Sequence, residues 1–387
     1  MESILKFASD FYKNIMKKRT FLTFLLAIFV LMGRAQTLPD VSNSNTQIRV
    51  EVSEEVELMA VVAISVGAQE FGDSTSQYYK ETKEYFADYQ QHPAITYFRE
   101  IRNAYGLAYD RVTSMAVRLE IVNDKVRFVG NPDELPGGWK YVNIKEFIEL
   151  LGKFYKDSHF HEFFEQHKPF YEEYLKFYQP VLLSNIHPEW YSRFFYGTEQ
   201  TDLFCTIIGF NYGSTNNGVW RQLPSQSREV FDVMGFQMNP RKGRPYCMID
   251  VVVHEYAHSY VNSLLESPQN VAMMESVGQQ LLQLSLAAMN RQAYGEWHIV
   301  INESIVRAAV IIYLMDNGFN QNAVQVIMQN EVNRGFLWMP ELVASLQNYA
   351  AHRDQYKTLN DYYPEIARCL QKYLDDKSSE SQKALQQ

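Results

Sequence analysis

The pentapeptide His254-Glu255-Tyr256-Ala257-His258, of the form HExxH, lies inside an apolar run from Met248 to Val261. An α-helix turns once in about 3.6 residues, so the two histidines share one face of a helix. The valines before the motif would bury that helix, and a buried helix that carries two imidazoles and a carboxylate needs partners for them. The chain is therefore constrained to place this helix in its interior, with its polar face against another polar group or an ion.

Two imidazoles at this spacing can hold one zinc ion, and Glu255 beside them can take a proton from a water on the metal. The pattern predicts metal-assisted hydrolysis, most often of a peptide bond. The motif arises by chance in roughly one chain per hundred of this length, so its apolar context carries much of the argument. The alternative is an ordinary buried helix whose histidines bond to backbone carbonyls.

A hydrolytic zinc site needs three protein ligands and one open position. The positions after His258 lack the Gly and the third His of the longer H-E-x-x-H-x-x-G-x-x-H pattern, so we expect a carboxylate from a second helix. Glu303 and Glu275 are the candidates. We favour Glu303, because Ile, Val and Ala surround it and an unpaired buried charge is costly, whereas Glu275 has the flanks of a surface residue. Glu303 can also pair with Arg307, four residues on, and the two roles are compatible.

Asn302-Glu303 on a helix that follows HExxH resembles the gluzincin metallopeptidases, the thermolysin-like class whose third zinc ligand is a Glu that often follows an Asn. The resemblance implies that His254, His258 and Glu303 bind one Zn²⁺ per chain and that Glu255 is the general base. This chain departs from that class in the longer gap between the second His and the Glu. It also has Arg307 where thermolysin itself often has an acidic residue.

The wider pattern resembles a group of exported, uncharacterised proteins of Bacteroidetes-type bacteria. The similar features are His258-Ser259 with Asn262, then Tyr294-Gly295, then the segment from Glu303 to Ala308. This resemblance covers most of the mature chain, and it implies a peptidase fold without a known substrate.

Peptide hydrolysis passes through a tetrahedral intermediate whose negative charge needs a hydrogen-bond donor. His298, Tyr212, Tyr260 and Tyr313 are candidates. We prefer His298, which precedes the Glu303 helix, and Tyr212, which ends a possible edge strand. Each of these side chains is also compatible with a purely structural role.

Asp250 and Asn262 lie one helical turn on either side of the two histidines. Outer groups at such positions commonly fix the tautomer of a metal-binding imidazole. The alternative is that they cap the helix or face solvent.

The N-terminal region reads as a secretory signal peptide over residues 1–35. Lys17-Lys18-Arg19 precedes an apolar stretch over 20–32, and Gly33-Arg34-Ala35 offers a cleavage site before Gln36. Met16 is a plausible start, which would make residues 1–15 an upstream extension. An uncleaved anchor is the alternative, but the stretch is shorter than the roughly 20 residues of a spanning helix. We expect an exported protein, periplasmic or secreted, without a stable membrane span after cleavage.

Composition indicates a folded enzyme rather than a disordered or nucleic-acid-binding chain. The 387 residues are 46% hydrophobic and 14% aromatic, which supplies a large core. The formal net charge of -9, without Lys/Arg clusters beyond the leader, argues against nucleic acid as a partner. The three cysteines do not form a metal-binding pattern, and the sequence leaves open whether Cys205 and Cys247 pair.

We expect a mainly helical α+β fold. A polar linker over 36–47 precedes a mainly helical N-terminal lobe over 48–199, then a zincin-like metallopeptidase domain over 200–375 with a small antiparallel sheet, and a polar tail over 376–387. Strands are predicted over 48–52, 203–210 and 228–236, with the segment around Gly218 as a connection, while 58–66 fits strand or helix. In gluzincins an edge strand beside the zinc holds an extended substrate, and either the strand over 203–210 or that over 228–236 takes this role, or both are core strands.

These observations imply an exported zinc-dependent metallopeptidase that cleaves a peptide or protein substrate through a zinc-activated water, with Glu255 as general base. An inactive peptidase-fold binding protein of the bacterial cell envelope is the alternative, since a fold does not imply its function. The intact Glu255 counts against that alternative. A third reading is an exported helical protein with a chance HExxH. Metal content distinguishes this third interpretation from the other two, and peptide turnover distinguishes the active peptidase from the inactive binding protein.

Overall fold

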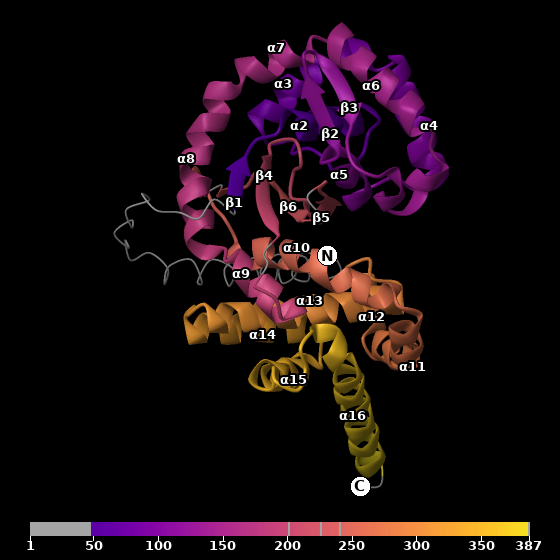
Figure 1. Cartoon of the computed structure of the whole chain (residues 1–387), viewed down its shortest axis with the longest axis vertical. Coiled ribbons are helices and arrows are strands. Elements are labelled where there is room, and N and C mark those ends of the chain that lie inside the picture. The colour runs from indigo at the N-terminus through magenta and orange to yellow at the C-terminus, as the bar shows by residue number, and fades with distance from the viewer. Residues whose placement is uncertain (1–47, 200–201, 225–226, 240, 386–387) are drawn as a thin grey trace, which may run out of the picture.

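The computed structural model describes residues 48–199, 202–224, 227–239 and 241–385, so the predicted signal peptide and linker lie outside it. The mainly helical α+β class is confirmed. In Figure 1 the N-terminal half curves around one side of a small sheet, and a set of helices from the C-terminal half lies on the other side. The three cysteines are free.

The N-terminal half is built from short helices and one hairpin. The segment over 58–66, which fitted strand or helix, is helical: the side chain of Ser53 accepts the N–H of Val56 and so caps a helix whose first turn is acidic. The elements are β1 (Ile48–Glu51), α2 (Glu54–Ser65), α3 (Gln77–Tyr85), η2 (Ala87–Tyr89), α4 (Pro93–Tyr105), α5 (Asp110–Ala116), β2 (Leu119–Val122), β3 (Lys125–Phe128), η3 (Pro132–Glu134), η4 (Gly137–Tyr141), α6 (Ile144–Asp157), α7 (Phe160–Gln166) and α8 (Lys168–Asn185).

The main sheet is mixed, so the predicted antiparallel sheet is wrong. Its strands are β1, β4 (Leu203–Gly209), β6 (Arg228–Gly235) and β5 (Asn216–Gln222), in the order β1-β4-β6-β5. β1 and β6 run parallel to β4, and only β5 is antiparallel to its neighbour β6. The parallel pairing of β1 arises because a long helical crossover separates it from β4.

Strand β5 lies in the segment that we predicted as a connection between strands. It begins with Asn216-Asn217-Gly218, residue types that are depleted in strands, so local composition did not indicate it. Seven consecutive pairings with β6, from Asn216 with Met234 to Gln222 with Arg228, hold it in the sheet. Tertiary pairing therefore overrides local preference here and makes β5 an edge of the sheet.

The C-terminal half is helical after a short ribbon. Its elements, with those that lead into it, are α9 (Pro188–Tyr191), η5 (Ser192–Tyr196), β7 (Met238–Asn239), β8 (Arg244–Pro245), α10 (Ile249–Val261), η6 (Asn262–Glu266), α11 (Pro268–Leu284), α12 (Leu286–Asn290), α13 (Trp297–Asp316), α14 (Gln321–Asn333), α15 (Met339–Ala351) and α16 (Leu359–Leu385). The predicted polar tail over 376–387 is helical as far as Leu385, because α16 continues through it.

Helix α13 is the central helix of this half. It is long and apolar enough to cross a membrane by length and composition, but 78% of its most apolar window is buried inside the fold. It packs against α10, α11, α14 and α15. The apolar character of α13 is therefore explained by its place in the core.

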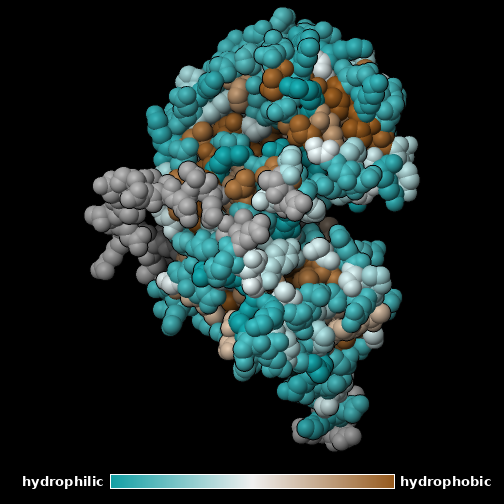
Figure 2. Space-filling view, in the orientation of Figure 1, coloured by the Kyte–Doolittle hydropathy of each residue, from teal (hydrophilic) through white to brown (hydrophobic). Residues whose placement is uncertain are grey.

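The two halves share their core across the boundary predicted near residue 200. β1 pairs with β4, and the indole of Trp190 donates to Asp316 of α13 at 2.8 Å. Figure 2 shows a mostly hydrophilic surface that is hollowed at the side where the two halves meet.

Candidate metal centre

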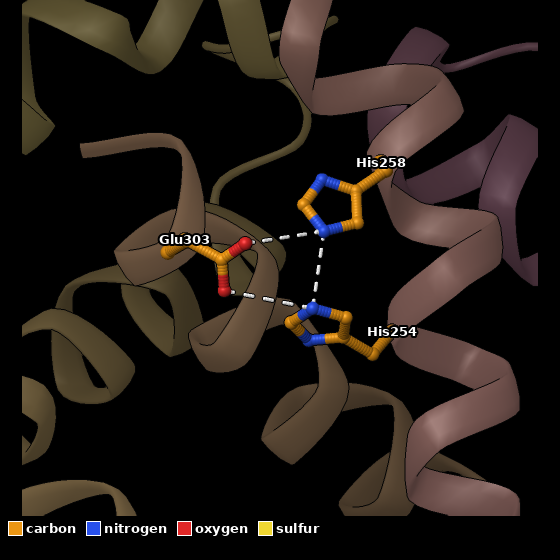
Figure 3. A group of neighbouring side chains, drawn as sticks. All are labelled: His254, His258 and Glu303. Atoms are coloured by element: carbon orange, nitrogen blue, oxygen red, sulfur yellow. Dashed lines mark hydrogen bonds and ion pairs between the residues drawn. The ribbon is translucent and has the colours of Figure 1, made fainter. Parts of the chain in front are cut away.

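Helix α10 places the HExxH motif between the sheet and α13. Val252, Val253, Tyr256 and Ala257 are fully buried and fix the orientation of the helix. His254 and His258 then project from the opposite face, one turn apart, toward α13 (Figure 3). The helix predicted from the pattern is confirmed, with its polar face turned inward.

Glu303 on α13 meets both imidazoles. Its Oε2 lies 3.6 Å from Nε2 of His254, and its Oε1 lies 3.4 Å from Nε2 of His258 (Figure 3). The two Nε2 atoms are 3.0 Å apart. The three residues form a group whose ligand atoms all lie within 4.8 Å of one another.

These separations fit a tetrahedral zinc site. Four ligands at about 2.1 Å from Zn²⁺ lie roughly 3.4 Å from one another, close to the distances among His254, His258 and Glu303. Nδ1 of His258 lies 3.0 Å from Oδ1 of Asn262, an acceptor, so Nδ1 carries a ring proton and Nε2 is the nitrogen that faces Glu303. Asn262 thus contacts His258 directly, and its orienting role stays a prediction.

A line of ion pairs continues behind the cluster. Nη2 of Arg307 donates to Glu303 at 2.8 Å and to the hydroxyl of Tyr294 at 3.1 Å, and Nη1 donates to Glu331 at 2.7 Å. Glu331 also accepts from Arg334 at 3.0 Å. The predicted pair of Glu303 and Arg307 is present; Oε1 of Glu303 faces His258, and Oε2 lies near both His254 and Arg307.

The pKa values of the three side chains are shifted in different directions. Glu303 is held as a carboxylate, and the pKa values of the two imidazoles shift in opposite directions. Burial alone would raise the pKa of Glu303, but His254, His258 and Arg307 outweigh it and hold that pKa well below its usual range. Burial lowers the pKa of His254. Burial also opposes charge on His258, but the hydrogen bond and charge of Glu303 raise its pKa to about 9. A metal ion bound here must therefore displace a proton from His258.

Glu255 lies beside the cluster and is held by the edge strand. Its Oε2 accepts the backbone N–H of Gly218 at 2.8 Å. A side chain at Gly218 would collide with the backbone of Glu255, because a Cβ there would lie 1.8 Å from its carbonyl oxygen. Burial raises the pKa of Glu255 to about 7, which suits a general base near neutral pH.

A cavity of about 230 Å³ opens beside the cluster. Both acidic and basic side chains line this cavity, and two of the lining residues belong to the HExxH motif. The lining residues are Asp250, Val251, His254, Glu255, Tyr294, Arg307, Val310, Ile327, Glu331 and Arg334. Asp250, predicted to orient a histidine, makes no hydrogen bond to His254 within the described ranges.

The remaining candidates lie apart from the cluster. Glu275 is exposed on α11 and accepts a hydrogen bond from Gln279, and it lies outside the group of His254, His258 and Glu303. His298 is exposed near the start of α13, against Trp297, and its catalytic role stays a prediction.

The tyrosine candidates are structural. Tyr212 is fully buried with its ring 5.0 Å from that of Phe71, and a hydroxyl enclosed on all sides cannot reach a substrate. The hydroxyls of Tyr260 and Tyr313 donate to Asp202 and to the carbonyl of Asn185, both at 2.7 Å.

Two residues near Glu255 were missed in the sequence. Gly218 was assigned to a connection, although it supplies the N–H that holds Glu255. Asp232 is fully buried on β6, opposite Gly218, and neither of its oxygens has a hydrogen-bond partner among the residues that the structure describes. Burial, with the charge of Glu255, raises the pKa of Asp232 well above its usual range. A carboxylate inside the apolar run Val230-Phe231-Asp232-Val233 was the available signal.

Residues 48–369 match a family described as a domain of unknown function, DUF4932, and the chain belongs to this family. Neither a curated protein nor a solved structure matches the chain.

Proposed function

We propose that this protein is an exported zinc-dependent metallopeptidase of the gluzincin type. The observation that carries the proposal is the convergence of Glu303 on His254 and His258, at distances that fit one tetrahedral ion, with Glu255 next to them. Three protein ligands and one open position are typical of hydrolytic rather than structural zinc sites.

The arrangement of the sheet supports a zincin-like fold. β5 is an edge strand, it alone runs antiparallel to its neighbour, and it packs against α10. The expected edge strand beside the metal helix is thus β5, rather than either strand predicted from the sequence. Export rests on the signal peptide pattern over residues 1–35.

Zn²⁺ bound by the three ligands would supply a Lewis acid that polarises the scissile carbonyl and acidifies water. Glu255 takes the proton of the attacking water, since its pKa of about 7 leaves the carboxylate available near neutral pH. The N–H of Gly218 keeps that carboxylate turned toward the site. Glu255 then passes the proton to the leaving amine, and Arg307 holds Glu303 in its orientation.

Elemental analysis of the mature chain from Gln36 onward tests the metal centre. We expect about one zinc per chain in the parent, which follows from a single three-ligand cluster. Glu303→Ala should lose it and Glu275→Ala should keep it. A parent chain without zinc after reconstitution would eliminate the enzyme proposal.

Turnover of a mixed peptide library, followed by mass spectrometry, tests the reaction. Glu255→Gln keeps the shape of the side chain and an acceptor for Gly218 but removes the base. We expect it to retain zinc and to lose peptide hydrolysis by a factor of about 10²–10⁴. A zinc-loaded parent that cleaves no peptide would favour the inactive binding protein.

A further inference from the structure

Strand β5 borders the proposed metal centre, so its outward backbone groups decide what can pair with the sheet there. The pairing with the β6 segment continues through Thr215 and Leu223 on either side of the strand. Because an antiparallel pair bonds at alternate residues, the odd-numbered residues of β5 bond to β6. The N–H and C=O groups of Gly218, Trp220 and Gln222 therefore face away from the sheet.

Most of this edge is already occupied. The C=O of Trp220 accepts Nη2 of Arg118 at 2.7 Å, and the N–H of Gln222 donates to Glu134 at 3.4 Å. The N–H of Gly218 donates to the general base. Helix α5 also packs against the strand. The groups that close the far end of β5 belong to the N-terminal half of the chain.

The side chain of Arg118 is buried and firmly held against the edge of β5. Only 1% of its surface is exposed, Nη1 donates to the carbonyl of Ser114 at 3.0 Å, and the guanidinium lies 3.5 Å from Glu134. A peptide that paired with Trp220 would have to displace this buried cation and leave its hydrogen bonds unmade, which is costly. An extended substrate therefore cannot continue along β5 past Trp220.

The open part of the edge is short. Among the described residues, none bonds to the outward backbone groups of Asn216 or to the C=O of Gly218. A strand rises about 3.3 Å per residue, so this stretch can pair with roughly two or three residues of a peptide.

We infer that the site accepts short peptides or the end of a chain rather than the middle of an extended segment, because Arg118 and Glu134 close the sheet edge beside it. This inference rests on the proposed peptidase function and adds a limit on substrate length to it.

A peptide ladder tests the limit with the zinc-loaded mature chain. Peptides of one sequence, from about four to about twelve residues, are offered with free ends and with both ends blocked, and products are identified by mass spectrometry. We expect one or two residues to be released from a free end. For the blocked series we expect kcat/KM to fall by at least about tenfold from the shortest to the longest peptide.

Two variants open the edge. Glu134→Ala, at the half-buried end of η3, frees the N–H of Gln222 and removes the ion-pair partner of Arg118, and Arg118→Met removes the cation itself. Each should raise kcat/KM on the longest blocked peptide by about tenfold. Arg127→Ala, an exposed arginine of β3 paired with Glu120, is the matched control and should leave the length profile unchanged. If Arg118→Met does not fold, Glu134→Ala alone decides.

Cleavage inside the longest blocked peptide as fast as in the shortest would overturn the length limit and leave the peptidase proposal standing. An unchanged length profile in folded Glu134→Ala would also overturn the assigned cause. A zinc-loaded chain that cleaves no member of the ladder or of the mixed library would remove both proposals together.

Discussion

Helices α2 and α13 each bury a glutamate within an apolar stretch, and the two carboxylates have opposite surroundings. Glu303 on α13 is 7% exposed and faces two imidazoles and the guanidinium of Arg307. Glu57 on α2 is fully buried and meets only uncharged donors. These donors are the N–H of Phe210 at 2.6 Å, the N–H and side chain of Asn211 at 3.4 and 3.0 Å, and the hydroxyl of Tyr78 at 3.2 Å.

The pKa values of the two residues diverge accordingly. Burial raises the pKa of Glu57 to about 7, and its hydrogen bonds offset this only in part. The cationic and imidazole neighbours of Glu303 hold its pKa far below the usual range despite burial. Burial in apolar sequence therefore does not by itself mark a metal ligand. The proposed ligand Glu303 is distinguished by the groups that face it, which leave its carboxylate ionised and turned toward two nitrogen donors.

The largest expected effect separates the two glutamates by zinc affinity. Glu303→Gln should weaken zinc binding by at least about a thousandfold, because protein zinc sites bind with roughly 10–16 kcal/mol shared among four ligands. Glu57→Gln should bind zinc as the parent does. Competition with a fluorescent chelator measures both dissociation constants. Equal zinc affinity in the two variants would contradict the assignment of the third ligand.

The next effect concerns how the free energy of unfolding depends on pH through Glu57. The folded-state pKa of Glu57 is raised from 4.5 to about 7, so the folded chain holds a proton between these values that the unfolded chain has lost. The stabilisation is full below pH 4.5 and is lost as the pH rises through about 7. The linked change is about 3 kcal/mol.

Urea unfolding of parent and Glu57→Gln at several pH values measures this difference, since glutamine cannot lose the proton. The free energy of unfolding of the parent, minus that of the variant, should fall between pH 5 and pH 8. Any cost of the amide itself adds a constant offset. A difference that stays constant or rises with pH would show that Glu57 is ionised in the folded state.

The smallest effect concerns the orientation of one ligand. Asn262→Ala removes the acceptor from Nδ1 of His258 and should weaken zinc binding by about tenfold, the lower end for loss of an outer-shell partner. Ser263→Ala is the control, because that neighbouring side chain donates to the carbonyl of Tyr260 in α10 and not to a histidine. Calorimetric zinc titration compares the two. Equal affinity in both variants would mean that Asn262 does not orient the ligand.

Much of the candidate site followed from local sequence. The spacing of His254 and His258 within apolar residues predicted a buried helix with one polar face, and the apolar flanks of Glu303 favoured it over Glu275 as the third ligand. The apolar-flank argument alone would have suited Glu57 equally well, since it precedes Leu58-Met59 in a buried helix. Glu303 was favoured over Glu275 for its apolar flanks, and only the gluzincin resemblance, a Glu after an Asn on a helix that follows HExxH, set it apart from Glu57.

Other parts of the site lay beyond local sequence. β5 was missed because Asn216-Asn217-Gly218 has poor strand preference, and its pairing partners lie in β6. Tyr212 was chosen as a donor because it ends a strand, but the turn after β4 folds it into the core.

The sequence by itself determined the helix that carries His254, Glu255 and His258, and the mainly helical class of the fold. Both depend on the periodicity of apolar residues over a few turns, which is a local property of the sequence. Only the tertiary structure decided that Glu303 faces the histidines, that Gly218 holds Glu255, and that Arg118 closes the edge of β5. Gly218 and Glu255 lie 37 residues apart in the sequence, and Arg118 and Trp220 lie 102 residues apart. Such long-range pairings are chosen by the packing of whole elements, which no local pattern encodes.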